Sequence, residues 1–517
     1  MSQVRIDRRG LLCGVAGGLA GAALGPFAFP GIARATAPIR ELAVRSRVIE
    51  VQGRAATVFG IVDEAGRPGL DLYRSEGFHA RLRNDSAEPT IIHWHGLTPP
   101  FGLDGNPLSQ PPMAPGESAE YTFDLTHPGT HWMHSHFGLQ EQLLLAAPLI
   151  VRDDAERGID RQDVVMFLHD FSFTPAEEIL ARLTSGQMAH IGSGSAAMEM
   201  GMVRAPASGM DHAAMGHAMP GMVHGGAGQQ GMAGMDHGAA AAGGHGIGGM
   251  DLNDVAFDAF LVNDRDLSDP EVVRVERGGR VRLRIINAAA STNFWIDLGP
   301  ATGALVAVDG RAVQPVRGQR FEIAMAQRLD IELDVPSEAV ALPILAQREG
   351  DRARTGLILA ASGARVERVA AEAGSVAPPV LLDLERKLVA AEPLPDRTAD
   401  RRLATDLTGS MAPYVWSLDG HGFADRVPLE VREGERIELT FVNQTMMSHP
   451  MHLHGHHFQI VGLGQTRLSG AMRDTVLVPA MESVTIAFDA DNPGDWPLHC
   501  HNLYHMAAGM MTSLRYA

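Results

Sequence analysis

The sequence predicts an all-β protein made of three Greek-key β-sandwich domains. A strand-like segment of alternating residues that ends in Asn occurs three times, at 81–84, 282–287 and 438–443. Short alternating segments are separated by Gly and Pro turns, a pattern typical of β-sandwiches. The length agrees, because 517 residues leave room for about three domains of ordinary size.

A second repeat relates the two ends of the chain. Residues 115–124 are followed by a Pro-Gly turn and a histidine pair, and residues 481–489 are followed by the same combination. The middle copy, at 321–324, has no histidine pair after it. We therefore expect domains at 38–155, 160–365 and 385–517, with a linker at 366–384 before the third.

One part of the second domain has a different composition. Residues from about 186 to 250 consist largely of Gly, Ala, Met and His. Such a segment has almost no large aliphatic side chains and cannot build a hydrophobic core. We predict that it is an insertion in the second domain.

The N-terminus has the features of a cleavable export signal. Arg8 and Arg9 form a twin-arginine motif, an apolar Gly/Ala-rich run follows, and Ala33-Arg34-Ala35 offers a cleavage site. The run is too short and Gly-rich for a membrane anchor. We expect residues 1–35 to be removed and the mature protein to be periplasmic, with no membrane-spanning segment. The net charge of −18 is spread along the chain, which argues against nucleic acid as a partner.

Cleavage of the signal would leave one cysteine. Cys13 lies within the signal, and the only other cysteine is Cys500, so the mature chain could form no internal disulfide. Cys500 stands between the two histidines of a His-x-His pair. The chain has four such pairs, which are His93/His95, His134/His136, His452/His454 and His499/His501.

The spacing of these pairs suits metal binding. In a strand, residues i and i+2 point to the same face, so each pair can direct two imidazoles into one cavity. Imidazole binds copper, zinc, iron and nickel, so the pairs alone do not identify the metal. Two His, one Cys and a weak axial Met make a blue-copper site, and His449, Cys500, His505 and Met510 supply that set. Zinc is disfavoured because structural zinc sites are closed Cys/His tetrahedra, and one cysteine is available.

The motifs resemble a known family. His93-Trp94-His95-Gly96, His134-Ser135-His136 and the segments 449–455 and 499–510 resemble the four copper signatures of the multicopper oxidases. The Met-Asp-His repeats and the sequence at 503–506 are most similar to the bacterial copper-resistance branch. The resemblance covers the whole mature chain. It implies cupredoxin-like domains and oxidation of a substrate coupled to four-electron reduction of dioxygen to water.

The resemblance also implies one type 1, one type 2 and two type 3 copper ions. His449, Cys500, His505 and Met510 match the type 1 ligands, and His93 and His452 match the type 2 ligands. The type 3 pair would be held by His95, His134, His136, His454, His499 and His501. Cys500 would carry electrons from the type 1 ion to the other three.

Proton supply is the least regular part of the pattern. Asp104 in Leu103-Asp104-Gly105 matches an acidic position of the family near the copper cluster, although Asp-Gly is also a common turn. We expect Asp104 to take part in catalysis by supplying protons. Some relatives carry Glu directly after the second type 1 histidine, where this chain has Met506, so that proton donor is absent.

We expect the substrate to be Cu(I), oxidised for copper tolerance. Met447 matches a methionine that contacts substrate copper in cuprous-oxidising relatives, and Met446 lies beside it, but Thr445 stands where those relatives carry Asp. Thioether sulfur prefers Cu(I), and the insertion repeats thioether beside imidazole at Met210, His212, Met215, His217, Met235 and His237.

Two alternatives have different consequences. A laccase-like enzyme would oxidise a small phenol instead of Cu(I). A non-catalytic periplasmic copper-binding or storage protein would explain the insertion but not the position of Cys500 within a histidine pair. Consumption of dioxygen separates the enzymes from the storage protein. In each case we expect a monomer.

Overall fold

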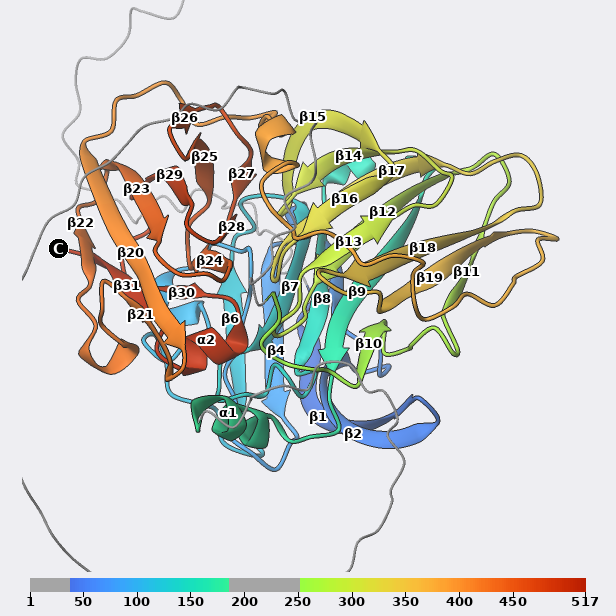
Figure 1. Cartoon of the computed structure of the whole chain (residues 1–517), viewed down its shortest axis with the longest axis horizontal. Helices are drawn as coiled ribbons and strands as arrows, with labels where there is room; N and C mark the ends of the chain where they lie inside the picture. Colours follow the sequence, from blue (N-terminus) through green and yellow to red (C-terminus); the bar gives the residue numbers. More distant parts are fainter. Residues whose placement is uncertain (1–37, 186–251) are drawn as a thin grey trace, which may run out of the picture. The chain divides into compact units, whose positions relative to one another are not determined.

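The structure is a computed structural model that describes residues 38–185 and 252–517. The predicted export signal and the predicted insertion lie outside these residues. The described chain forms six β-sheets (Figure 1). None of its helices has the length and apolar character needed to cross a bilayer.

Residues 40–152 form the N-terminal pair of sheets. One sheet has the order β2-β1-β4-β6 and contains β1 (Arg40–Val51), β2 (Arg54–Asp63), β4 (Phe78–Asn84) and β6 (Ser118–Phe123). The other has the order β3-β8-β7-β5 and contains β3 (Leu70–Tyr73), β5 (Ile92–His93), β7 (Gly129–Ser135) and β8 (Ala146–Arg152). Their core includes Leu82, Trp94 and Leu149.

Residues 162–361 form the middle pair. One sheet, β10-β9-β12-β17-β14-β15, contains β9 (Gln162–Phe171), β10 (Ala259–Val262), β12 (Arg280–Asn287), β14 (Gly303–Val308), β15 (Arg311–Gly318) and β17 (Arg328–Asp334). The other, β11-β19-β18-β13-β16, contains β11 (Val272–Val275), β13 (Phe294–Asp297), β16 (Arg320–Ile323), β18 (Ala341–Arg348) and β19 (Arg354–Ala361). Leu283, Ile331 and Ile344 lie in the core of this pair.

Residues 401–516 form the C-terminal pair. One sheet, β21-β20-β23-β29-β25-β26 with β27 paired to β25, contains β20 (Arg401–Met411), β21 (Tyr414–Leu418), β23 (Arg436–Asn443), β25 (Phe458–Leu463), β26 (Thr466–Arg467), β27 (Met472–Arg473) and β29 (Ser483–Asp489). The other, β22-β31-β30-β24-β28, contains β22 (Leu429–Val431), β24 (His449–Leu453), β28 (Thr475–Val478), β30 (Asp495–Cys500) and β31 (Met511–Tyr516). Leu439, Trp496 and Cys500 lie in its core.

The described chain has little helix. The α-helices are α1 (Ala176–Thr184) and α2 (Leu503–Ala507), and the short 3-10 helices are η1 (Arg74–Glu76), η2 (Phe101–Leu103), η3 (Asp154–Glu156), η4 (Glu385–Lys387) and η5 (Phe423–Asp425). Helix α1 buries Ile179 and Leu183 against the C-terminal core. The prediction of an all-β fold of sandwiches is confirmed.

The three Asn-ended segments occupy equivalent strands. Strands β4, β12 and β23 each pair in parallel with the first long strand of their unit and antiparallel with a later strand. Each ends in a buried Asn, namely Asn84, Asn287 or Asn443, whose side-chain amide donates to a backbone carbonyl of the next loop. A buried amide must be satisfied, and these bonds fix where each strand ends and its loop turns.

Buried polar contacts join the sheet pairs where the site lies. The Arg328 guanidinium of β17 forms an ion pair with Asp474 between β27 and β28, and donates to the backbone carbonyl of Thr130 in β7. Arg473 pairs with Asp309 at 3.2 Å and with Glu385 at 2.9 Å. Because these charges are buried, removal of one partner would leave another charge unpaired. The network therefore fixes how the three pairs of sheets pack against one another.

Candidate metal centres

The four His-x-His pairs all lie at strand ends. His93 ends β5, His134 lies in β7, His452 lies in β24 and His499 lies in β30. The second histidine of each pair lies just past the last residues of its strand, which differs from the expectation that both lie within the strand. Strand pairing places His93 opposite His134 and His452 opposite His499. The eight rings are all buried.

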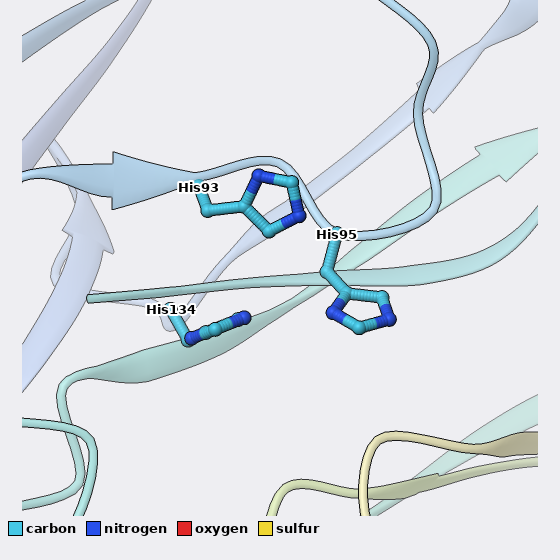
Figure 2. Close-up of side chains that lie close together, drawn as sticks. All are labelled: His93, His95 and His134. Atoms are coloured by element: carbon cyan, nitrogen blue, oxygen red, sulfur yellow. The ribbon is translucent and has the colours of Figure 1, made fainter. Parts of the chain in front are cut away.

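The rings from the two ends of the chain meet in one cluster. Nε2 of His452 lies 3.4 Å from Nε2 of His93, and Nε2 of His499 lies 3.0 Å from that of His454 and 3.4 Å from that of His136. His93, His95 and His134 bring their ring nitrogens within 4.8 Å of one another at the ends of their segments (Figure 2). Imidazole nitrogens that converge in this way could hold metal ions between them.

The outer ring nitrogens fix the direction of the inner ones. Nδ1 of His93 lies 3.0 Å from the carbonyl oxygen of Asp104, Nδ1 of His452 lies 2.8 Å from that of Asp474, and Nδ1 of His499 lies 2.9 Å from that of Cys500. These rings therefore present Nε2 to the cluster. His95 is reversed: its Nε2 lies 3.1 Å from Asp474 Oδ1, and its buried Nδ1 has no partner.

Two buried carboxylates border the cluster. Asp104 lies directly after η2, with Oδ2 at 2.7 Å from His454 Nδ1 and 3.4 Å from His93 Nδ1, and its Oδ1 has no partner. Glycine is needed beside it, because a Cβ on Gly105 would lie 1.8 Å from the Ile92 carbonyl oxygen. Glu141 has Oε2 at 3.0 Å from His134 Nδ1 and Oε1 at 3.7 Å from His501 Nδ1.

A second group of ligand atoms surrounds Cys500. Its Sγ lies 3.7 Å from Nδ1 of both His449 and His505, and these two Nδ1 atoms are 3.0 Å apart. Met510 is buried in the same core, and its carbonyl accepts from the Cys500 backbone N–H at 3.0 Å. Asn502 caps α2 by accepting from the backbone N–H of His505, which sets that residue in the first turn.

The outer nitrogens of this second group also have partners. Nε2 of His449 lies 2.7 Å from the Thr445 hydroxyl, and Nε2 of His505 lies 2.8 Å from Asp254 Oδ2. Tyr414 and Asn502 donate to the same Asp254 oxygen. Burial by itself would raise the pKa of Asp254, but His505 and these two donors lower it below its ordinary value. The Asp254 carboxylate is therefore negatively charged where it contacts His505.

The neutral state of the imidazoles favours metal binding in the first cluster. Burial, and then the neighbouring histidines, lower the pKa of His95, His136 and His454 well below the ordinary value. The rings are therefore neutral, the state in which imidazole binds metal. Burial raises the pKa of the Cys500 thiol, so a cation is required to hold it as thiolate.

The residues fit copper. The inner nitrogens of His95, His134 and His501 are buried without hydrogen-bond partners, as ligand atoms awaiting an ion would be. Asp104 and Glu141 are buried among histidines with no Lys or Arg ion pair in the described chain, and a buried carboxylate is unfavourable without a cation. Thiolate with two imidazoles and a thioether is the blue-copper donor set.

The predicted substrate residues are placed differently from one another. Met446 is 56% exposed, whereas Met447 is 6% exposed and packs in the C-terminal core. Met210, His212, Met215, His217, Met235 and His237 lie outside the described residues. The structure brings every predicted histidine and cysteine ligand and Asp104 into one of the two groups, and Met510 packs in the same core as Cys500.

Sequence reasoning missed Thr445 as a hydrogen-bond partner and the carboxylates Glu141, Asp254 and Asp474. Glu141 carried a weak signal, since Gln140-Glu141-Gln142 interrupts an otherwise apolar run. Asp254 and Asp474 approach histidines that are distant in the chain, and no local sequence pattern predicts such a contact.

Comparisons with known proteins agree with this geometry. Family profiles described as multicopper oxidase match residues 43–156, 236–358 and 396–517. The multicopper oxidase MmcO of Mycobacterium tuberculosis is 30% identical over 448 residues, which cover 84% of this chain and 78% of that protein. Copper resistance protein A of Escherichia coli is 25% identical, with 99% of each chain covered.

A solved structure shares the fold. The laccase from Botrytis aclada matches with a TM-score of 0.69 at 20% identity, over 93% of this chain and 89% of that one. Together, the family profiles and the similarity to MmcO over most of both chains confirm the family inferred from the histidine motifs. The chain belongs to the multicopper oxidases, and it is an oxidoreductase that uses copper and dioxygen.

Proposed function

We propose that this multicopper oxidase oxidises Cu(I) and holds its copper in two centres linked by Cys500. His449, Cys500, His505 and Met510 would bind a type 1 ion, and His93 and His452 a type 2 ion. The six remaining histidines, His95, His134, His136, His454, His499 and His501, would bind a type 3 pair. Copper at these ligands would supply the one-electron chemistry that reduces dioxygen to two waters.

The observation that carries this proposal is the end of β30. Cys500 belongs to the group with His449 and His505, while its neighbours His499 and His501 belong to the eight-histidine cluster. A continuous covalent path therefore runs from one group of ligand atoms to the other through a few backbone bonds. No storage site requires this connection.

The carboxylates give the chain a way to orient ligands and hold protons. Asp104 Oδ2 orients His454, and its Oδ1, which has no partner, is an atom at which a proton can be held. This position supports a role in proton supply, which reduction of dioxygen requires. Met506 offers no acid at the position used by some relatives.

Three observations support Cu(I) as the reductant. Copper resistance protein A is among the relatives. The insertion, outside the described residues, repeats soft thioethers beside imidazoles. The described residues on both sides of the insertion lie near the proposed type 1 ligands. Helix α1, before it, packs in the C-terminal core, and Asp254, after it, contacts His505.

A laccase-like reaction with a small phenol is the alternative, and similarity to laccases favours it.

We further propose export by the twin-arginine route to the periplasm, a monomer, and domains at 38–155, 160–365 and 385–517. The arrangement of the sheets supports this domain division, because each predicted domain contains one pair of sheets.

Oxygen consumption with Cu(I) and with a phenol tests the proposal. We expect Cu(I) to be oxidised with the higher kcat/KM. Deletion of residues 190–248 should lower efficiency at limiting Cu(I) while the blue colour remains. A matched variant that keeps the length but replaces Met210, Met215 and Met235 by Ser separates sulfur from spacer effects. A wild-type enzyme that oxidises only the phenol would return the laccase-like reaction to first place.

A further inference from the structure

We propose that His127, His131, Arg311 and His457 form a binding site for a small oxyanion where the three pairs of sheets meet. None of the four is among the copper ligands proposed above. His127 lies just before β7 and His131 within it, Arg311 begins β15, and His457 directly precedes β25. Each pair of sheets therefore contributes at least one member. These four residues are called the Arg311 cluster below.

Two glycines bring parts of the Arg311 cluster into contact. A Cβ on Gly129 would lie 2.4 Å from the Cα of Gly310, so the segment that follows His127 touches the turn that precedes Arg311. A Cβ on Gly310 would lie 2.6 Å from Cε1 of His131 and 3.1 Å from its Nε2. The His131 ring therefore packs directly on the residue before Arg311.

The histidines of the cluster carry nitrogens that no protein group satisfies. His131 is 0% exposed, and among the described residues neither of its ring nitrogens has a hydrogen-bond partner. His457 has a buried Nε2 that also lacks one, and its ring meets that of His127 edge to face with the centroids 5.7 Å apart. Buried polar atoms are nearly always hydrogen-bonded, so these nitrogens indicate a bound group.

Arg311 adds a positive charge that the protein hardly balances. Its side chain is 12% exposed, and its one ion pair in the described chain is with Glu392 at 3.8 Å, whose side chain is 83% exposed. Burial lowers the pKa of Arg311, and Glu392 opposes this shift. By contrast, Arg328, which also acts on His131, is paired with the buried Asp474. Water alone would satisfy the nitrogens but not the charge of Arg311, which an anion would stabilise.

The electrostatics of the cluster favour an anion over a metal ion. Burial, and then Arg311 and Arg74, lower the pKa of His127 to about 4. Burial is the main cause that lowers the pKa of His457 to about 3 and that of His131 well below its ordinary value, and Arg311 contributes to both. The rings are therefore neutral, and each can donate one N–H. A metal ion would be repelled by Arg311, whereas an oxyanion would accept from the guanidinium and from the imidazoles.

The matching ligand is a small oxyanion such as sulfate, phosphate or a carboxylate. The planar guanidinium of arginine can donate to two oxygens of one such group. Because the donors belong to all three pairs of sheets, a bound oxyanion would connect these pairs. It would bind the folded chain and not the unfolded one, and would therefore raise the stability of the protein.

Isothermal titration calorimetry of the copper-loaded enzyme with sodium sulfate, at constant ionic strength, tests the site. We expect wild type to bind one sulfate per chain and Arg311→Gln to bind it at least about tenfold more weakly, because a charged hydrogen bond is lost. Arg311→Lys keeps the charge and should fall between the two. The matched control is Arg317→Gln, which removes the same charge from an exposed position of β15 and should bind sulfate as wild type does.

Titrations with phosphate and acetate identify the class of oxyanion. Tighter binding of sulfate or phosphate than of acetate would assign the site to inorganic oxyanions, and the reverse order would assign it to carboxylates. Sulfate should also raise the unfolding temperature of wild type and Arg317→Gln more than that of Arg311→Gln.

His127→Asn separates an anion site from a metal site. We expect this variant to bind sulfate more weakly than wild type while the blue absorption remains, because His127 is not a proposed copper ligand. Absence of sulfate binding, or equal affinity in wild type, Arg311→Gln and His127→Asn, would overturn the proposal. Zn(II) that binds to copper-loaded wild type and Arg311→Gln but not to His127→Asn would overturn it in favour of a metal site.

Discussion

The Asp104 carboxylate lies 2.7 Å from Nδ1 of His454, although the two residues are 350 positions apart in the chain. Asp104 belongs to the N-terminal pair of sheets and His454 to the C-terminal pair. The reverse contact also exists, because Asp474 of the C-terminal pair lies 3.1 Å from Nε2 of His95. Each pair of sheets therefore orients a histidine that the other contributes.

Asp104→Asn should impair oxygen reduction. The side-chain oxygen of the substituted residue can still accept a hydrogen bond from His454, but it no longer carries a negative charge. His454 must also compete for this oxygen with Asn106, which donates to it at 2.6 Å. Loss of a group that is hydrogen-bonded to a metal-binding histidine lowers activity roughly 10–100-fold. We expect oxygen consumption to fall by at least about tenfold while the blue absorption persists. Asp85→Asn, at an exposed site of the same sheet pair, is the control. Unchanged oxygen consumption would exclude a catalytic role for Asp104.

Asp254→Asn should raise the reduction potential of the blue site. The Asp254 carboxylate lies 2.8 Å from His505 Nε2, and its negative charge stabilises the oxidised, more positive ion. Spectroscopic redox titration of the blue band measures the shift. The exposed Asp258, four residues later, provides the control substitution Asp258→Asn. An equal potential in wild type and Asp254→Asn would show that the carboxylate does not influence the ligand electronically.

The fold and the convergence of the His-x-His pairs were predictable because both follow from local periodicity. The Asn-ended strands repeat a residue pattern, and His-x-His spacing directs two side chains to one side even where the second lies past the strand end. The contacts of Glu141, Asp254 and Asp474 were not predictable, because each reaches a histidine of another strand or sheet pair. Thr445 shows a further limit: it departs from the acidic residue of cuprous-oxidising relatives, yet its hydroxyl still contacts His449.

Glu141→Gln should selectively disturb the proposed type 3 pair. Its two oxygens lie 3.0 Å from His134 Nδ1 and 3.7 Å from His501 Nδ1. An amide presents an N–H to one of these nitrogens, so one ring must turn or change its protonated nitrogen. We expect electron paramagnetic resonance to reveal uncoupled copper that is silent in wild type, while the blue band is unchanged. Glu349→Gln, a buried glutamate of the middle pair, should keep the wild-type spectrum. A silent pair in Glu141→Gln would refute the orienting role.

Glu349 should make stability depend on pH. Burial raises its pKa to about 7, from an ordinary value of 4.5, although the Val380 backbone N–H opposes the shift. Between these values the unfolded chain gives up the proton while the folded chain keeps it, so stability falls as pH rises. The loss amounts to about 3 kcal/mol once pH exceeds about 7. Glu349→Gln should remove this fall.

Denaturant unfolding of wild type and Glu349→Gln at about pH 5 and about pH 8 measures the difference. Other groups titrate equally in both proteins, so the comparison isolates Glu349. The same dependence of unfolding free energy on pH in both proteins would show that Glu349 is ionised in the folded state.

The visible absorption spectrum of copper-loaded Cys500→Ser tests the central claim most directly. Cys500 is the only cysteine of the described chain, and it belongs to the group with His449 and His505 while its neighbours His499 and His501 belong to the histidine cluster. We predict that the variant loses the strong blue band of the wild type, retains copper at the eight histidines, and no longer couples substrate oxidation to oxygen consumption. A Cys500→Ser protein that stays blue, or that consumes oxygen at the wild-type rate, would contradict the account.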